Sequence, residues 1–294
     1  MAGAAHSLPL FGSEDEPDAR SRSTAVPERM GRARIEQIVA SSILTRASGF
    51  MDAYDFTLNP YSGCAFGCTY CYAAFFAREA ELRDTWGDWV KVKSNAVDKL
   101  RRMRTDIRGK TIYMSSVTDP YQPIERRLEL VRELLHVLVE RQPRLVVQTR
   151  SPLVTRDVDV LGRFDVKRIN MTVTTDSEAV RKAFEPSCPG LKQRLDAITA
   201  VREAGIPTSI TMTPLLPLED AEAFADALVA TGVRHFVVQP FHAERGKFVA
   251  GTRDEARRIT AELGWDDAAY RRAVAIIRDR IPDLQEGREG FAPE

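Results

Sequence analysis

Short runs of apolar and β-branched residues are spaced along the chain between longer stretches of mixed polarity. They are KTIYMSS (110–116), RLVVQT (144–149), RINMTVT (168–174), TSITMT (208–213) and HFVVQP (235–240). Runs of this length and composition are typical of buried β-strands. A further strand is indicated near YDFTLNP (54–60), which brings the expected number of strands to about six.

The stretches between these runs have the apolar period of helices. We expect helices over residues 94–107, 125–142, 191–205 and 219–232. Gly205 and Gly232 stand where the C-terminal caps of the last two helices are expected. Strands separated by helices of this length call for right-handed crossovers and a parallel sheet. The pattern therefore predicts an α/β fold, a partial (β/α)6 barrel rather than a complete eight-fold one.

The two ends of the chain differ from this alternating middle. Residues 1 to about 40 are rich in Ser, Arg, Pro and acidic residues and have no sustained apolar period, so we expect a mostly disordered leader. The barrel is expected over residues 41–245. Residues 246–294 contain two helical stretches of mixed charge, which predict a C-terminal helical extension.

Composition narrows the class of protein. With 294 residues, of which 44 % are hydrophobic and 29 % are charged, the chain is typical of a globular protein with a substantial core. Basic and acidic residues number 42 each, so there is no overall positive charge of the kind that binds nucleic-acid backbones nonspecifically. Neither a secretory signal nor a long apolar span is present, so we expect no membrane insertion and a cytoplasmic location, where disulfides are rare.

Three of the four cysteines lie close together, in NPYSGCAFGCTYCYAAFF (59–76). Cys64, Cys68 and Cys71 form a C-x3-C-x2-C pattern on a loop directly after the first expected strand, and clustered thiols in a reducing compartment bind metal or perform redox chemistry. Structural zinc usually takes a fourth Cys or His ligand, and only the isolated Cys188 and four scattered histidines remain. A [4Fe–4S] cluster on three thiolates leaves one iron open to a non-protein ligand. The pattern favours such a cluster over zinc, and its place at the carboxyl end of a strand indicates catalysis.

The cysteine spacing, with Tyr70 before the last cysteine, resembles the signature loop of the radical S-adenosylmethionine (SAM) superfamily. The resemblance implies that the amino and carboxylate groups of SAM chelate the open iron. It also implies that the reduced cluster cleaves SAM to methionine and a 5′-deoxyadenosyl radical, which abstracts hydrogen from a substrate. An electron donor such as flavodoxin or ferredoxin is implied as a partner.

Within this superfamily, segments of the chain together resemble the spore photoproduct lyase family over residues 54–242. They are CTYCY (68–72), SSVTDP (115–120), QTR (148–150), FEPSCPGLKQRLDAI (184–198) and AGIPTSITMTPLLP (204–217). The resemblance implies that Tyr70 and Tyr72 lie near the adenosine and take part in the return of a hydrogen atom. The other cofactor-binding residues that it implies are Ser116, Thr118 and Asp119 at the methionine end, Arg150 at the carboxylate, and Thr174, Arg194 and Thr213 facing the same pocket.

One residue departs from the family pattern. Members that reverse lesions carry a hydrogen-donating cysteine three residues before the aspartate of the second-strand segment, where this chain has Ser116. An alcohol O–H bond is too strong for that role, and a basic C-terminal segment is also missing. We therefore expect a radical SAM enzyme that acts on a nucleic-acid base or nucleotide other than the spore photoproduct. A radical SAM enzyme that tailors a small molecule or peptide is a second hypothesis, and a non-radical iron–sulfur electron-transfer or zinc-binding protein is a third.

Overall fold

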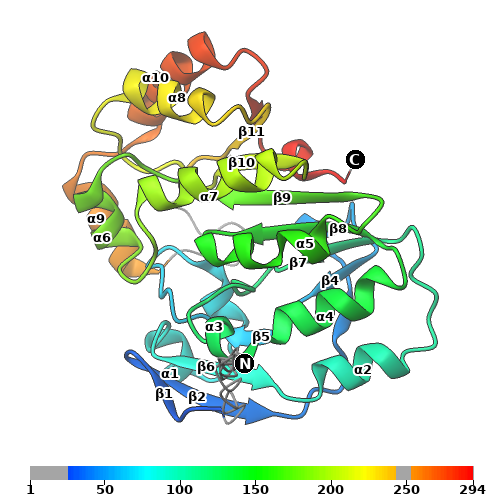
Figure 1. The fold of residues 1–294 in the computed structure, drawn as a ribbon. Helices are drawn as coiled ribbons and strands as arrows, with labels where there is room; N and C mark the ends of the chain where they lie inside the picture. The colour runs from blue at the N-terminus through cyan, green and yellow to red at the C-terminus, as the bar shows by residue number, and fades with distance from the viewer. Residues whose placement is uncertain (1–25, 243–252, 294) are drawn as a thin grey trace, which may run out of the picture.

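The computed structural model describes residues 26–242 and 253–293, and an eight-stranded sheet in the order β12-β11-β10-β9-β8-β7-β4-β3 forms its centre (Figure 1). Its inner strands are parallel and confirm the expected ones: β4 (Phe56–Leu58), β7 (Thr111–Met114), β8 (Arg144–Thr149), β9 (Lys167–Thr172), β10 (Thr208–Met212) and β11 (His235–Val238). Antiparallel β3 (Leu44–Arg46) and parallel β12 (Gln285–Glu286) are added at the two edges. In the part of the chain that is described, the edges do not pair with each other, so the barrel is partial.

A second sheet has the order β1-β2-β6-β5, and its strands flank the cysteine loop in the sequence. Its strands are β1 (Arg29–Met30), β2 (Ala33–Ile38), β6 (Trp89–Lys93) and β5 (Tyr61–Gly63). Residues 29–38 therefore form strands where the sequence predicted part of a disordered leader, and the structure corrects that expectation. Ala33 and Ile35 are buried because β2 pairs in parallel with β6, a distant segment that no local pattern reveals. The remainder of the expected leader, residues 1–25, lies outside the described residues.

Helices connect the strands and cover the central sheet. They are α1 (Ala80–Asp84), α2 (Ala96–Arg102), α3 (Glu125–Leu128), α4 (Leu130–Val139), α5 (Val158–Leu161), α6 (Glu178–Phe184), α7 (Leu191–Glu203), α8 (Ala221–Ala230), α9 (Asp254–Glu262) and α10 (Asp267–Arg280). In Figure 1, α4, α5 and α7 lie on the near side of the sheet, and α10 packs beside α8. Gly205 and Gly232 follow the ends of α7 and α8 with φ of +78° and +72°, which confirms their expected role. None of the helices in residues 26–242 and 253–293 is long and apolar enough to cross a bilayer.

The single helix expected over residues 125–142 is wrong, because the chain breaks at Glu129, whose φ is +51°. The break follows from the fully buried side chain of Glu125. Its carboxylate accepts hydrogen bonds from the backbone N–H of Val131, at 3.0 and 3.1 Å, and so satisfies a donor in the first turn of α4. The same carboxylate pairs with Arg156 at 2.7 Å and accepts a hydrogen bond from Tyr61.

Replacing Glu125 by alanine is expected to lower the free energy of unfolding by about 3 kcal/mol, since a guanidinium, a hydroxyl and a helix N–H lose a shared buried partner. Chemical denaturation of the purified protein measures the change. Glu133→Ala, at an exposed position on α4, is the matched control and is expected to change stability by less than about 0.5 kcal/mol. Equal losses for the two variants would contradict this account of the helix break.

Candidate functional site

The cysteine loop follows β5 rather than β4, so a short strand of the second sheet lies between the first barrel strand and the cysteines. Two tight turns shape the loop: the N–H of Gly67 donates to the carbonyl of Cys64 at 3.2 Å, and that of Cys71 donates to the carbonyl of Cys68 at 3.1 Å. Gly67 has φ of +61°, and a Cβ there would lie 3.1 Å from Cα of Gly87. A glycine is therefore needed both for the turn and for the close packing of the two segments.

The thiols lie in a mostly apolar environment. Cys64 and Cys68 are 7 % and 4 % exposed, Cys71 is half-buried, and Phe66, Trp86, Phe184 and Leu216 belong to the same packed cluster. Burial raises the pKa of the Cys64 thiol well above its usual range and raises that of Cys71 to about 12. The pKa of Cys68 is lowered, chiefly by its contact with Cys188 and also by Arg150, against the opposing effect of burial.

The residues of the loop fit an iron–sulfur cluster in their chemistry and place. Three thiols lie on one loop with an apolar shell, and the buried indole Nε1 of Trp86 has no hydrogen-bond partner among the described residues, so this donor is free to bind a sulfur. In residues 26–242 and 253–293, no three Cys, His, Asp or Glu side chains lie close enough together to hold a metal ion. The three thiols therefore do not converge in this structure. Sγ of Cys68 instead contacts Sγ of Cys188, at 3.6 Å, and Nη1 of Arg150, at 3.1 Å.

The position of Cys188 corrects one step of the sequence argument. In the sequence Cys188 is isolated, and the lack of a fourth ligand beside the loop argues against zinc. The turn after α6 in fact brings Cys188 into contact with Cys68. The number of nearby thiols alone therefore does not distinguish a zinc site from an iron–sulfur cluster.

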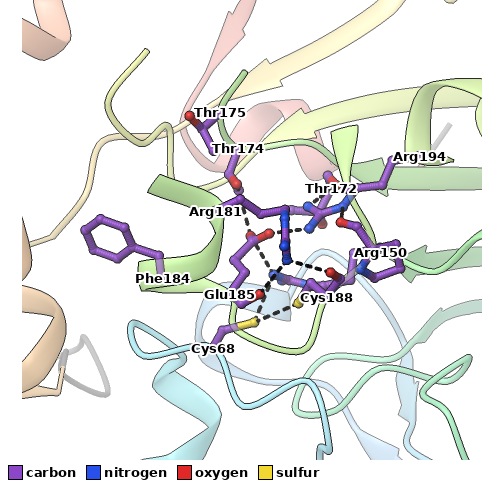
Figure 2. Close-up of polar contacts among 12 residues, drawn as sticks. Cys68, Arg150, Thr172, Thr174, Thr175, Arg181, Phe184, Glu185, Cys188 and Arg194 are labelled. Atoms are coloured by element: carbon purple, nitrogen blue, oxygen red, sulfur yellow. Dashed lines mark hydrogen bonds and ion pairs between the residues drawn. The ribbon is translucent and has the colours of Figure 1, made fainter. Parts of the chain in front are cut away.

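A buried carboxylate organises the polar part of the site (Figure 2). Glu185 is fully buried just after α6, and its Oε1 accepts hydrogen bonds from Tyr70 Oη at 2.5 Å, Arg150 Nη1 at 2.9 Å and Thr174 Oγ1 at 3.0 Å. Its Oε2 pairs with Arg194. Burial raises the pKa of Glu185, but Arg194 and Arg150 outweigh this effect and lower it to about 2. Glu185 is therefore an anion that joins the cysteine loop, the ends of β8 and β9, and helix α7.

Two guanidiniums share this one carboxylate. Arg194 is 2 % exposed and also donates to the backbone carbonyls of Pro189, at 2.9 Å, and Thr172, at 3.1 Å. Nη1 of Arg150 additionally contacts Tyr70 Oη, at 2.7 Å. The guanidinium of Arg150 lies against the cysteine loop as well as against Glu185, and a guanidinium binds a carboxylate through charge-assisted hydrogen bonds. The residues therefore fit the carboxylate of SAM beside the cysteine loop.

Asp119 fixes the segment from which Arg150 projects. The side chain is buried, and its carboxylate accepts hydrogen bonds from the N–H of Arg150 at 2.9 Å, the hydroxyl of Thr149 at 2.7 Å and the N–H of Tyr121 at 2.9 Å. Burial raises the pKa of Asp119 while these hydrogen bonds oppose the rise. In this structure Asp119 thus positions Arg150.

Ser116 and Thr118 connect the end of β7 to the cysteine loop. The backbone N–H of Ser116 donates to Asn59 Oδ1 at 3.0 Å, and its carbonyl accepts a hydrogen bond from the hydroxyl of Tyr72. The hydroxyl of Thr118 donates to the carbonyl of Gly63 at 2.6 Å, directly before the first cysteine. Tyr72 is 43 % exposed, in contrast to buried Tyr70.

The structure thus brings Tyr70, Arg150, Thr174 and Arg194 together around one carboxylate. Ser116, Thr118 and Tyr72 form a neighbouring group, and half-buried Thr213 lies on the segment after β10. Sequence reasoning missed Glu185 and the contact made by Cys188. Both lie in the segment FEPSCPG, which in the sequence carries only a family resemblance, and a glutamate usually faces solvent.

The chain is similar to a family of known sequences. The radical SAM superfamily profile matches residues 58–229. An uncharacterized protein of Methanocaldococcus jannaschii is 35 % identical over 162 residues, 55 % of this chain and 61 % of that protein. A radical SAM Nalpha-GlyT isomerase of Pseudomonas phage M6 is 27 % identical over 190 residues, 61 % of this chain and 38 % of the phage protein. The chain thus spans less than two thirds of either relative.

The fold also has relatives among solved structures. Spore photoproduct lyase complexed with dinucleoside spore photoproduct superposes with a TM-score of 0.57 at 15 % identity, covering 86 % of this chain and 81 % of that one. A variant of the same lyase gives a TM-score of 0.59 at 14 % identity, covering 89 % and 86 %. At these identities the likeness concerns the fold. The superfamily profile covers more than half of the chain, and the chain therefore belongs to the radical SAM superfamily, whose enzymes use a [4Fe–4S] cluster and SAM, and it has the fold of spore photoproduct lyase.

Proposed function

We propose that Cys64, Cys68 and Cys71 hold the [4Fe–4S] cluster, that Arg150 meets the carboxylate of SAM, and that the substrate is a nucleic-acid base or nucleotide. The observation that carries the first two assignments is the place of Arg150. A single guanidinium nitrogen lies 3.1 Å from Sγ of Cys68 and 2.9 Å from Oε1 of Glu185, so one side chain joins the cysteine loop to the buried carboxylate.

When bound and reduced, the cluster supplies the electron that cleaves SAM to methionine and a 5′-deoxyadenosyl radical. The residues of the chain provide position and surroundings. Arg150 binds and orients the carboxylate of SAM. Glu185 holds the guanidinium of Arg150, and Asp119 holds its backbone N–H. Phe66 and Phe184, packed around the thiols, exclude water from the cluster. We propose a small electron carrier such as flavodoxin or ferredoxin as the reductant, and the cytoplasm as the place of action.

The exposed aromatic side chains beside the cysteine loop support a base as the substrate. Tyr72 and Phe76 are 43 % and 63 % exposed, and their ring centroids are 6.1 Å apart. Exposed aromatic rings are the surfaces on which proteins stack unpaired bases. Spore photoproduct lyase, which shares the fold, is complexed with a dinucleoside in its solved structure. Because Ser116 replaces a thiol donor, we propose that Tyr72, whose hydroxyl contacts the carbonyl of Ser116, returns the hydrogen atom.

The formal net charge of zero favours one other candidate, a small molecule or peptide as the substrate, since such a substrate needs no basic groove. Deuterium transfer separates the two. The reconstituted protein, reduced with dithionite and supplied with SAM, would be incubated with DNA and nucleotides from cells grown in deuterated water, or with a peptide digest of the same cells. Deuterium in 5′-deoxyadenosine, detected by mass spectrometry, is expected from the nucleic-acid pool. Deuterium from the peptide pool alone would refute the proposed substrate.

Replacing Tyr72 and Phe76 together by alanine is expected to weaken binding of single-stranded DNA by about 1–3 kcal/mol per lost stacked base, roughly 5- to 150-fold in dissociation constant for each base. Fluorescence anisotropy with a labelled oligothymidine measures the change. Phe50→Ala removes another exposed aromatic ring, one that packs against Phe291, and should leave the affinity unchanged. Equal affinities for wild type and the double variant would remove the support that these rings give to a nucleic-acid substrate.

A further inference from the structure

The fourth cysteine of the chain lies against one of the three loop cysteines. Sγ of Cys188 is 3.6 Å from Sγ of Cys68, although the two residues are 120 positions apart in the sequence. Both side chains are buried, at 7 % and 4 % exposure, and both thiols are free.

Hydrogen bonds hold the backbone of Cys188 and the sulfur of Cys68. Nη1 of Arg181 donates to the carbonyls of Cys188, at 2.7 Å, and of Glu185, at 3.0 Å, and the N–H of Cys188 donates to the carbonyl of Glu185 at 3.0 Å. The turn that carries Cys188 is therefore tied to α6. Nη1 of Arg150 contacts the sulfur of Cys68 at 3.1 Å. Figure 2 shows the two sulfur atoms facing each other beneath the carboxylate of Glu185.

We propose that Cys68 and Cys188 are a modification site: in the chain without its cluster, a peroxide converts them to a disulfide, which prevents the cluster from loading. A disulfide bond is about 2.05 Å long, so side-chain rotation has to close about 1.5 Å from the observed separation. The blocking effect rests on the proposed role of Cys68 as a cluster ligand, whereas formation of the bond does not.

The reaction balances with hydrogen peroxide as the oxidant. One thiol attacks the peroxide, its S–H and the O–O bond break, and a sulfenic acid and one water form. The sulfur of the second thiol then displaces the hydroxyl group: its S–H bond and the S–O bond break, the S–S bond forms, and the proton and the hydroxyl group leave as a second water. The two thiols lose two electrons in total, and the peroxide takes them up. A dithiol such as dithiothreitol reverses the bond by exchange.

This pairing has a consequence for recovery from oxidation. A sulfenic acid without a nearby thiol is oxidised further to sulfinic and sulfonic acids, which thiol reductants do not restore. With Cys188 in contact, Cys68 is trapped in a reducible form. Cys188 thus protects the ligand that the cluster needs and keeps the chain inactive until it is reduced.

Peptide mapping tests the bond on the full chain. The metal-free protein would be treated with stoichiometric hydrogen peroxide, its free thiols alkylated, and the protein digested without reductant for mass spectrometry. We expect a peptide pair linked through Cys68 and Cys188, with Cys64 and Cys71 alkylated. A link between two loop cysteines, or recovery of Cys188 as an alkylated free thiol, would overturn the proposal. This measurement involves no cluster, so a failure of the proposed function does not affect it.

Iron loading tests the consequence. After excess peroxide and its removal, wild type is expected to take up no more iron and sulfide than a variant without the loop cysteines, and to regain full uptake after dithiothreitol. Cys188→Ser keeps the three loop cysteines and is expected to load normally before oxidation, but to recover poorly after it. A variant that recovers as fully as wild type would show that Cys188 does not protect Cys68. A wild type that loads iron while the mapped disulfide is intact would show that the bond does not block loading.

Discussion

A chain in which Cys64, Cys68 and Cys71 are all replaced by alanine is expected to bind no iron–sulfur cluster. After anaerobic reconstitution, wild type should carry close to four iron and four sulfide ions per chain, as a [4Fe–4S] cluster requires, together with broad absorption in the visible range. The variant should carry neither. Since buried cysteine behaves as a small apolar side chain, alanine at these positions should preserve the fold, and circular dichroism checks this.

The matched control for this loss is Cys188→Ala. Cys188 contacts Cys68 but is not assigned as a ligand, so this variant should retain the full iron and sulfide content. Loss of iron in Cys188→Ala would instead make Cys188 a ligand. Zinc in place of iron in wild type purified without reconstitution, together with failure to take up iron, would favour the zinc-binding hypothesis.

Glu185→Gln is expected to lower the free energy of unfolding at pH 7 by about 3 kcal/mol. The substitution leaves Arg150 and Arg194 without their shared anion in a buried site, and removing one partner of a buried ion pair is strongly destabilising. Thermal or chemical unfolding measures the loss. Glu178→Gln is the control on the preceding helix and should cost less, because Glu178 is 57 % exposed and its partner Arg181 keeps its hydrogen bonds to the carbonyls of Glu185 and Cys188.

The pH dependence of stability tests whether the charge on Glu185 causes the loss of stability in Glu185→Gln. Its pKa falls from the usual 4.5 to about 2 in the folded chain, so the unfolded chain binds more protons between these two values. The stabilising contribution of Glu185 is therefore present above about pH 4.5 and is lost as the pH falls toward 2. We expect the difference in stability between wild type and Glu185→Gln to shrink over that interval. A difference that stays constant down to pH 2 would assign the effect to shape rather than to charge.

The central sheet could be predicted from the sequence because its strands are buried on both faces and therefore read as continuous apolar runs, such as RLVVQT in β8. The division between α3 and α4 could not. It depends on the contacts of Glu125 with Tyr61 and Arg156, which come from distant parts of the chain. Strand β2 was missed for a similar reason, since its burial depends on pairing with β6.

The residues of the candidate site also fall into those that the sequence could predict and those that it could not. The three loop cysteines could be recognised because their spacing is local, and Arg150 because it directly follows a strand. Glu185 could not be singled out, since its role arises only where Arg150 and Arg194 converge on it. For Arg194, an amphipathic helix alone leaves open whether the side chain faces solvent, and in the structure it is 2 % exposed. Residues whose function depends on several distant partners carry no periodic signal in the sequence.

Formation of 5′-deoxyadenosine tests the central claim most directly. The reconstituted wild type would be reduced with dithionite under anaerobic conditions, supplied with SAM and sampled over time by liquid chromatography, beside the variant in which Cys64, Cys68 and Cys71 are alanine. We expect wild type to form 5′-deoxyadenosine and methionine in equal amounts and the variant to form neither. A wild type that carries a full cluster and yet forms no 5′-deoxyadenosine, even with the nucleic-acid and peptide pools present, would contradict the assignment of radical chemistry to this site.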